Sequence, residues 1–118
     1  VVLVGHCGYD ARQLHKTVQS ALPELPIESA NETAELQPHA APDALLLVNR
    51  KLDAGLGTDN GIELIKELAG DNDAPRLMLI SNFDEAQSDA QAAGALPGFG
   101  KDHLGSETAT ERLKAAVE

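Results

Sequence analysis

The sequence predicts an α/β domain built on a five-stranded parallel sheet with helices on both faces. The first observation behind this prediction is a set of short apolar runs, such as residues 44–48 and 76–80, which are typical of strands buried on both faces. The second is that segments with helical spacing of apolar residues follow these runs, so that a strand–helix pair occurs five times. Connections of this length favour parallel strands joined by right-handed helical crossovers.

The first half of the chain contains three of the expected strands. Residues 1–4 are a β-branched run stopped by Gly5, and a helix follows over 11–22 with Asp10 as its candidate cap. Pro23 and Pro26 end that helix. A weak strand is expected over 26–29, a short helix over 31–36 broken by Pro38, and the third strand over 44–48.

The second half begins with a glycine-containing loop over 50–59. Asn60 then caps a helix that Gly70 ends. Residues 71–73 form a turn before the strand at 76–80, and alanines at helical spacing mark a fourth helix around 86–93. A short strand over 95–99 and a helix over 108–117 complete the chain.

Composition limits the kind of protein and its partners. The chain has 118 residues, which suits one domain over 1–118, and 42% of them are apolar. A formal charge of −10 argues against nucleic-acid binding by this domain. One cysteine favours a reducing, cytoplasmic setting, and no apolar run has membrane-spanning length. The start at Val1 inside a strand leads us to expect a domain trimmed from a longer chain.

Asn49 is the most informative single residue. It is the first polar residue after the third strand, at the sheet edge where α/β proteins place their chemistry. An aspartate there could accept a phosphoryl group, whereas an amide has no anionic oxygen for attack and brings no charge to a metal. The fold can therefore be predicted, but the aspartate that would accept a phosphoryl group at this position is missing.

The most specific local signal is the segment Gly94-Ala95-Leu96-Pro97-Gly98-Phe99-Gly100-Lys101. Together with the five strand–helix units, which cover nearly the whole chain, it resembles the receiver domain of two-component response regulators. In that family a lysine after the fifth strand contacts the phosphoryl group, and Lys101 matches its spacing. Ser81 matches the hydroxyl residue that ends the fourth strand. The resemblance implies a flavodoxin-like, doubly wound sheet of strand order 2-1-3-4-5.

The chain also departs from the receiver pattern. Asn49 falls where the phospho-accepting aspartate would be, and Gly5 and His6 fall where acids hold Mg²⁺. The position of the switching aromatic is Gly98, with Phe99 expected in the core. These departures predict a pseudo-receiver, with no enzyme activity, no cofactor and magnesium binding lost. A conventional receiver would require Asp53 to be the acceptor, although Asp53 lies well past the strand end.

The resemblance and the strand ends together define a candidate pocket. Its members are Gly5, His6, Cys7, Asn49, Arg50, Ser81, Asn82 and Lys101. One interpretation is a remodelled site in which Lys101 and Arg50 hold a small anion. The other, which we favour, is that Lys101 bonds to Asn49 or Ser81 and holds the loops.

His6 and Cys7 allow further interpretations. They could contribute to a soft metal site, with Asp10 or His103 as additional ligands, or Cys7 could be a reactive thiolate. Neither arrangement has a recognised spacing, so a loop imidazole beside a half-buried thiol is the favoured interpretation.

The resemblance makes the fourth helix the candidate partner face, because receivers bind partners in this neighbourhood. Its inner positions are only alanines, so it buries little area and could shift on binding. Its outer face is expected to be polar and to include Asp84, Glu85, Gln87, Ser88 and Gln91. An ordinary solvated helix is the alternative interpretation. The resemblance to receivers implies a signalling module that binds another protein or another domain of its own chain, with its oligomeric state open and dimerisation allowed.

Overall fold

The computed structural model of the chain describes residues 1–6, 8–39, 42–52, 56, 58–70 and 74–117. Its strands are β1 (Val2–Val4), β2 (Glu28–Ala30), β3 (Leu45–Asn49), β4 (Arg76–Ile80) and β5 (Leu96–Phe99). Its α-helices are α1 (Gly8–Ala21), α2 (Thr33–Leu36), α3 (Gly61–Ala69), α4 (Asp84–Ala92) and α5 (Glu107–Val117). Two 3₁₀ turns, η1 (Gln37–His39) and η3 (Lys101–His103), follow α2 and β5. Cys7, Asp53 and the turn expected at 71–73 lie outside the described residues.

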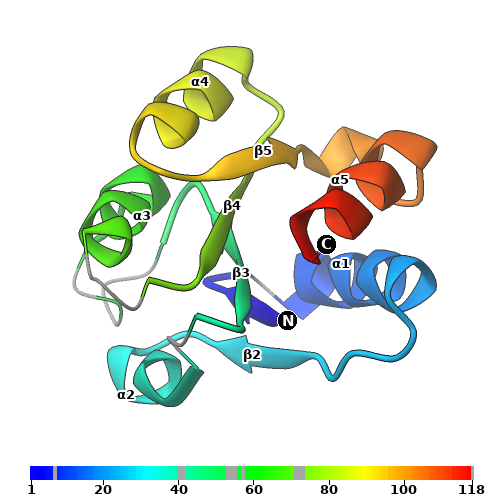
Figure 1. Cartoon of the computed structure of the whole chain (residues 1–118), viewed down its shortest axis with the longest axis horizontal. Helices are drawn as coiled ribbons and strands as arrows, with labels where there is room; N and C mark the ends of the chain where they lie inside the picture. Colours follow the sequence, from blue (N-terminus) through cyan, green and yellow to red (C-terminus); the bar gives the residue numbers. More distant parts are fainter. Residues whose placement is uncertain (7, 40–41, 53–55, 57, 71–73, 118) are drawn as a thin grey trace.

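The five strands form one parallel sheet in the order β2-β1-β3-β4-β5, as the resemblance implied. The central pair β3 and β4 is in register from Leu45 opposite Arg76 to Asn49 opposite Ile80. In Figure 1 helices α1 and α5 lie on one side of the sheet, and α2, α3 and α4 lie on the other. The predicted α/β doubly wound architecture is confirmed.

Alternation along the strands fills two separate cores. Leu45 and Leu47 of β3 pack with residues of α1 and α5, whereas Leu46 and Val48 pack with residues of α3 and α4. All four side chains are almost completely buried. Because both faces of a parallel sheet are covered, the buried positions of its central strands are all apolar. The first polar side chain then appears where β3 ends, at Asn49.

Local sequence signals also determine where α3, the helix after β3, begins. The Asn60 side-chain oxygen accepts hydrogen bonds from the backbone N–H groups of Ile62 and Glu63, as expected of a cap. Gly61 comes next, and a Cβ there would overlap the carbonyl of Asn49. The start of α3 can therefore pack directly against the end of β3 only because residue 61 is glycine.

Candidate functional site

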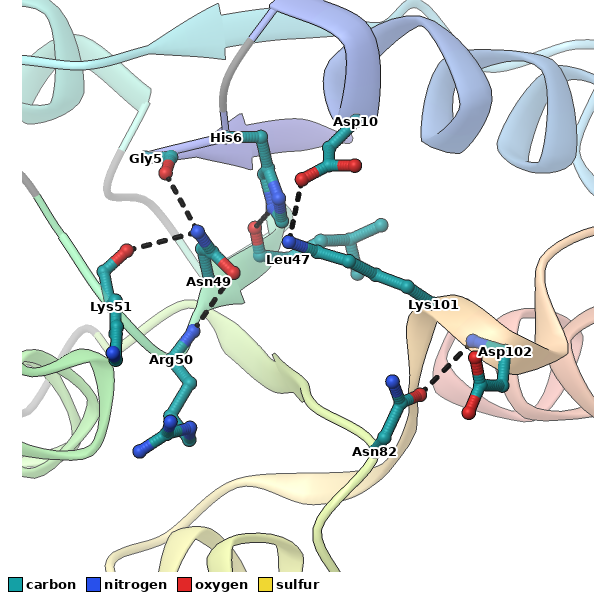
Figure 2. A network of polar contacts seen from close by, with 10 residues as sticks. All are labelled: Gly5, His6, Asp10, Leu47, Asn49, Arg50, Lys51, Asn82, Lys101 and Asp102. Atoms are coloured by element: carbon teal, nitrogen blue, oxygen red, sulfur yellow. Dashed lines mark hydrogen bonds and ion pairs between the residues drawn. The ribbon is translucent and has the colours of Figure 1, made fainter.

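The candidate pocket residues that the structure describes gather at the carboxyl edge of the sheet (Figure 2). Gly5 and His6 follow β1, Asn49 ends β3, Ser81 follows β4, and Lys101 begins the turn after β5. Parallel strands place their carboxyl ends at one edge, which explains how residues so distant in sequence meet. Cys7, the remaining predicted member, lies outside the described residues.

Asn49 is bonded through both ends of its side-chain amide. Its Nδ2 donates to the carbonyl oxygens of Gly5, at 3.1 Å, and Lys51, at 2.9 Å, while its Oδ1 accepts from the Arg50 N–H at 3.1 Å. Gly5 has φ +73° and leaves room for the Leu52 side chain, which a Cβ would overlap. The amide thus ties the loop after β1 to the loop after β3, and it needs both of its N–H groups to do so.

Lys101 does not bond to Asn49 or Ser81, and the prediction that it would is wrong. Its Nζ forms an ion pair with Asp10 Oδ2 at 2.6 Å. Asp10 is not the helix cap predicted from the sequence, because α1 begins at Gly8 and Asp10 lies within its first turn. The two side chains are 37% and 25% exposed, so their pairing contributes no more than about 1 kcal/mol. Its main effect is to direct the ammonium group toward α1.

His6 is buried just after the end of β1. Its Nε2 lies 2.9 Å from the Leu47 carbonyl oxygen, which can only accept, so Nε2 carries the proton. Nδ1 is buried without a hydrogen-bond partner among the described residues. Burial lowers the pKa of His6, and the Lys101 charge lowers it further against the opposing effects of Leu47 and Asp10. The described residues contain no group of three or more metal-ligating side chains that would include it.

Arg50 and Lys101 line the same cavity, as the anion-site interpretation requires, but each cationic group also has a partner of its own. The Arg50 guanidinium lies over the Phe83 ring, 4.9 Å from the ring centroid. In Figure 2 its side chain points away from Lys101, whose charge faces Asp10. The cavity, of about 170 Å³, lies between the two cations and includes Ser81 in its wall.

Ser81 and Asn82 act within the protein as turn residues. The buried Ser81 hydroxyl accepts from the Phe83 N–H at 3.2 Å. Asn82 Oδ1 accepts from the Asp102 N–H at 3.0 Å and so connects the end of β4 to the turn after β5. Both residues therefore have clear structural roles at the sheet edge.

Gln87 was predicted on the outer, partner-binding face of α4, and the structure corrects this. Its Nε2 lies 2.9 Å from the Leu79 carbonyl oxygen and 3.1 Å from that of Ser81, and its Oε1 accepts from the Gly98 N–H at 3.2 Å. The side chain therefore points toward β4 and β5. Gly98 permits this approach, because a Cβ there would crowd the Gln87 amide and the Leu79 carbonyl.

The remaining residues of the predicted partner face are exposed on α4. They are Asp84, Glu85, Ser88 and Gln91. On the inner face, Ala86 and Ala90 are buried as predicted. Sequence reasoning missed Phe83, whose ring is 59% exposed next to Arg50, although a lone aromatic between a strand end and an acidic helix start is an unusual signal.

Comparisons with known proteins support the fold. No protein-family model matches the sequence, and no curated protein matches it significantly. Solved structures do match. The signal receiver domain of a DNA-binding response regulator from Colwellia psychrerythraea 34H has a TM-score of 0.71 and 20% identity, over 98% of this chain and 95% of that chain. The receiver domain of NtrX from Brucella abortus has a TM-score of 0.66 and 21% identity, over 99% and 98%.

A third match is the receiver domain of the putative response regulator NarL from Mycobacterium tuberculosis. It has a TM-score of 0.64 and 24% identity, over 98% of this chain and 91% of that chain. This chain has the receiver fold. The receiver fold places Asn49 and Lys101 at the carboxyl edge of the sheet, as the resemblance implied. None of the described helices combines the length and apolarity required to cross a bilayer.

Replacing Asn49 by aspartate should destabilise the receiver fold. A carboxylate cannot donate to the carbonyls of Gly5 and Lys51, so we expect Asn49→Asp to cost about 1–3 kcal/mol of unfolding free energy at pH 7. The neighbouring carbonyls of Gly5 and Lys51 also disfavour the charged form of the new carboxyl group. The deficit should therefore shrink as the pH falls and the carboxyl group gains a proton to donate.

Urea denaturation at several pH values measures this effect. Asn82→Asp is the matched control, because Asn82 uses only its oxygen and a carboxylate can still accept from Asp102. Equal losses in the two variants would contradict the role given to the Asn49 amide.

His6 should make stability depend on pH. Its pKa is lower in the folded than in the unfolded chain, so the unfolded chain binds more protons once the pH falls below about 6.5. The wild type should lose stability in this range relative to His6→Gln, as measured by urea denaturation. His15→Gln, on the exposed side of α1, should not change the profile. Parallel profiles for the wild type and His6→Gln would disprove the assignment.

Gln87 should control how firmly α4 is held. We expect Gln87→Ala to speed amide hydrogen exchange in α4 and β5 by about tenfold, since it removes bonds to both β4 and β5. Ser88→Ala alters the exposed neighbouring residue and should leave exchange unchanged. Unchanged exchange in the Gln87 variant would show that the alanine face alone holds the helix.

Proposed function

We propose that this domain is a receiver-like signalling module of a two-component type of system that acts by binding another protein or another domain of its own chain. We further propose that it is not phosphorylated at Asn49. The likeness to response-regulator receiver domains supports the signalling role. The single observation that carries the second part is the Asn49 amide, which has no nucleophilic oxygen and uses both N–H groups to hold two backbone carbonyls.

Magnesium binding is proposed to be lost together with the acceptor. A divalent cation of this kind requires several hard oxygen ligands, usually carboxylates. The Gly5 carbonyl already accepts from Asn49, and the carboxylate of Asp10 is paired with Lys101 at 2.6 Å. The described residues at this edge therefore do not fit Mg²⁺, and we propose no cofactor and no enzymatic step for the domain.

The binding role rests on the exposed side of α4. Asp84, Glu85, Ser88 and Gln91 provide a polar surface there, while Gln87 fixes the helix to the sheet. A fixed helix offers a partner one preformed surface, which lowers the entropic cost of binding. We therefore propose a surface that is set permanently instead of one that phosphorylation alters.

Small phosphodonors provide the direct test. Acetyl phosphate or beryllofluoride with Mg²⁺ should leave both the intact mass and the amide NMR spectrum unchanged, apart from shifts produced by Mg²⁺ alone. The controls are spectra recorded with each component separately. A mass gain of one phosphoryl group, or saturable shifts around Asn49 and Lys101 that need both donor and metal, would disprove the proposal.

A further inference from the structure

Phe83 is an exposed aromatic residue at the start of α4. The described part of the chain exposes three large apolar side chains, namely Tyr9, Leu25 and Phe83. Of these, Phe83 is the one with a cation over its ring, the Arg50 guanidinium at 4.9 Å. Its backbone is extended (φ −88°, ψ 119°) and immediately precedes α4. The ring is thus held at the start of the helix, where a partner can reach it.

Phe83 borders a groove between α3 and α4. The groove has a volume of about 530 Å³ and includes Ile62 of α3 and Ala86 of α4 in its apolar part. In Figure 1 these two helices lie side by side on the same face of the sheet. The groove is separate from the exposed Ser88 and Gln91, which are not among its lining residues. It is large enough for one or two apolar side chains anchored beside the Phe83 ring.

The charges around the groove specify the partner's chemistry. Three carboxylates line it, from Asp84, Glu85 and Asp89, and the only cation that lines it among the described residues is Arg50. All three acidic residues are exposed. An aromatic face with carboxylates around it attracts ammonium and guanidinium groups and repels acidic chains and nucleic acids.

We propose that the α3–α4 groove docks a basic, amphipathic peptide segment of a protein partner. Apolar side chains of the segment occupy the space beside Phe83, Ile62 and Ala86, and its lysines or arginines pair with the carboxylates. One of its cations competes with Arg50 for the Phe83 ring. This inference rests on the proposed function only in that the domain acts through protein contacts, and it requires nothing of Asn49.

The probe for this site is a synthetic amphipathic helical peptide of leucine and lysine. Amide NMR titration of the domain should show saturable shifts at Ile62, Phe83 and Asp89. The same peptide with glutamate in place of lysine should give none. Phe83→Ala should weaken binding by about threefold to tenfold, and Phe83→Tyr should restore it, because the loss of one cation–π contact is of that size.

Matched variants separate a specific groove from general attraction to an acidic protein. The combined change Asp84→Asn, Glu85→Gln and Asp89→Asn should weaken binding about tenfold and reduce its salt dependence. Glu24→Gln, Glu28→Gln and Glu32→Gln remove the same formal charge near the β2 edge and should have little effect. Tyr9→Ala controls for exposed aromatics, since Tyr9 is 69% exposed on α1.

Results of two kinds would overturn the inference. The first is no saturable binding of the lysine peptide. The second is binding that Phe83→Ala leaves unchanged, or that both sets of charge changes weaken equally, since either would show diffuse electrostatic attraction. Neither result bears on the proposed function, which fails instead if a phosphodonor modifies the domain.

Discussion

The requirement to cover a parallel sheet on both faces is the constraint on which the rest of this structure depends. Leu45 to Val48 are buried on alternate sides, so β3 can carry a polar residue only at its end. Every neighbouring strand ends at the same edge, and the crossover helices begin there. The candidate site is therefore a consequence of the sheet, and its chemistry is decided by which side chain stands at each strand end.

At this edge the polar side chains are engaged in bonds within the protein. Asn49 bonds to three backbone groups, and Lys101 pairs with Asp10. His6 adds a buried ring bonded to β3. Each bond is individually modest, but together they close the loops after β1, β3 and β5 around one another. Such an arrangement favours one permanent conformation.

The sequence was sufficient to predict the fold and the position of Asn49, because strand burial and the spacing of apolar residues in helices are local patterns. The sequence was insufficient to predict contacts between segments that are far apart in the chain. Lys101 and Asp10 are 91 positions apart, and nothing local distinguishes Asp10 from a helix cap. Gln87 lies at the border between the alanine face and the polar face of α4, so only the position of the strands shows which way it points.

Helix α4 combines a buried contact with the sheet and two exposed surfaces. Its apolar anchor is small, yet Gln87 bonds it to both β4 and β5 at the place where Gly98 leaves room. That tether lets the helix carry polar residues on two sides without relying on a large buried face. One side presents Ser88 and Gln91, and the other presents Phe83 above the groove with α3. The Gly98–Gln87 contact therefore fixes the position from which both of these surfaces are presented.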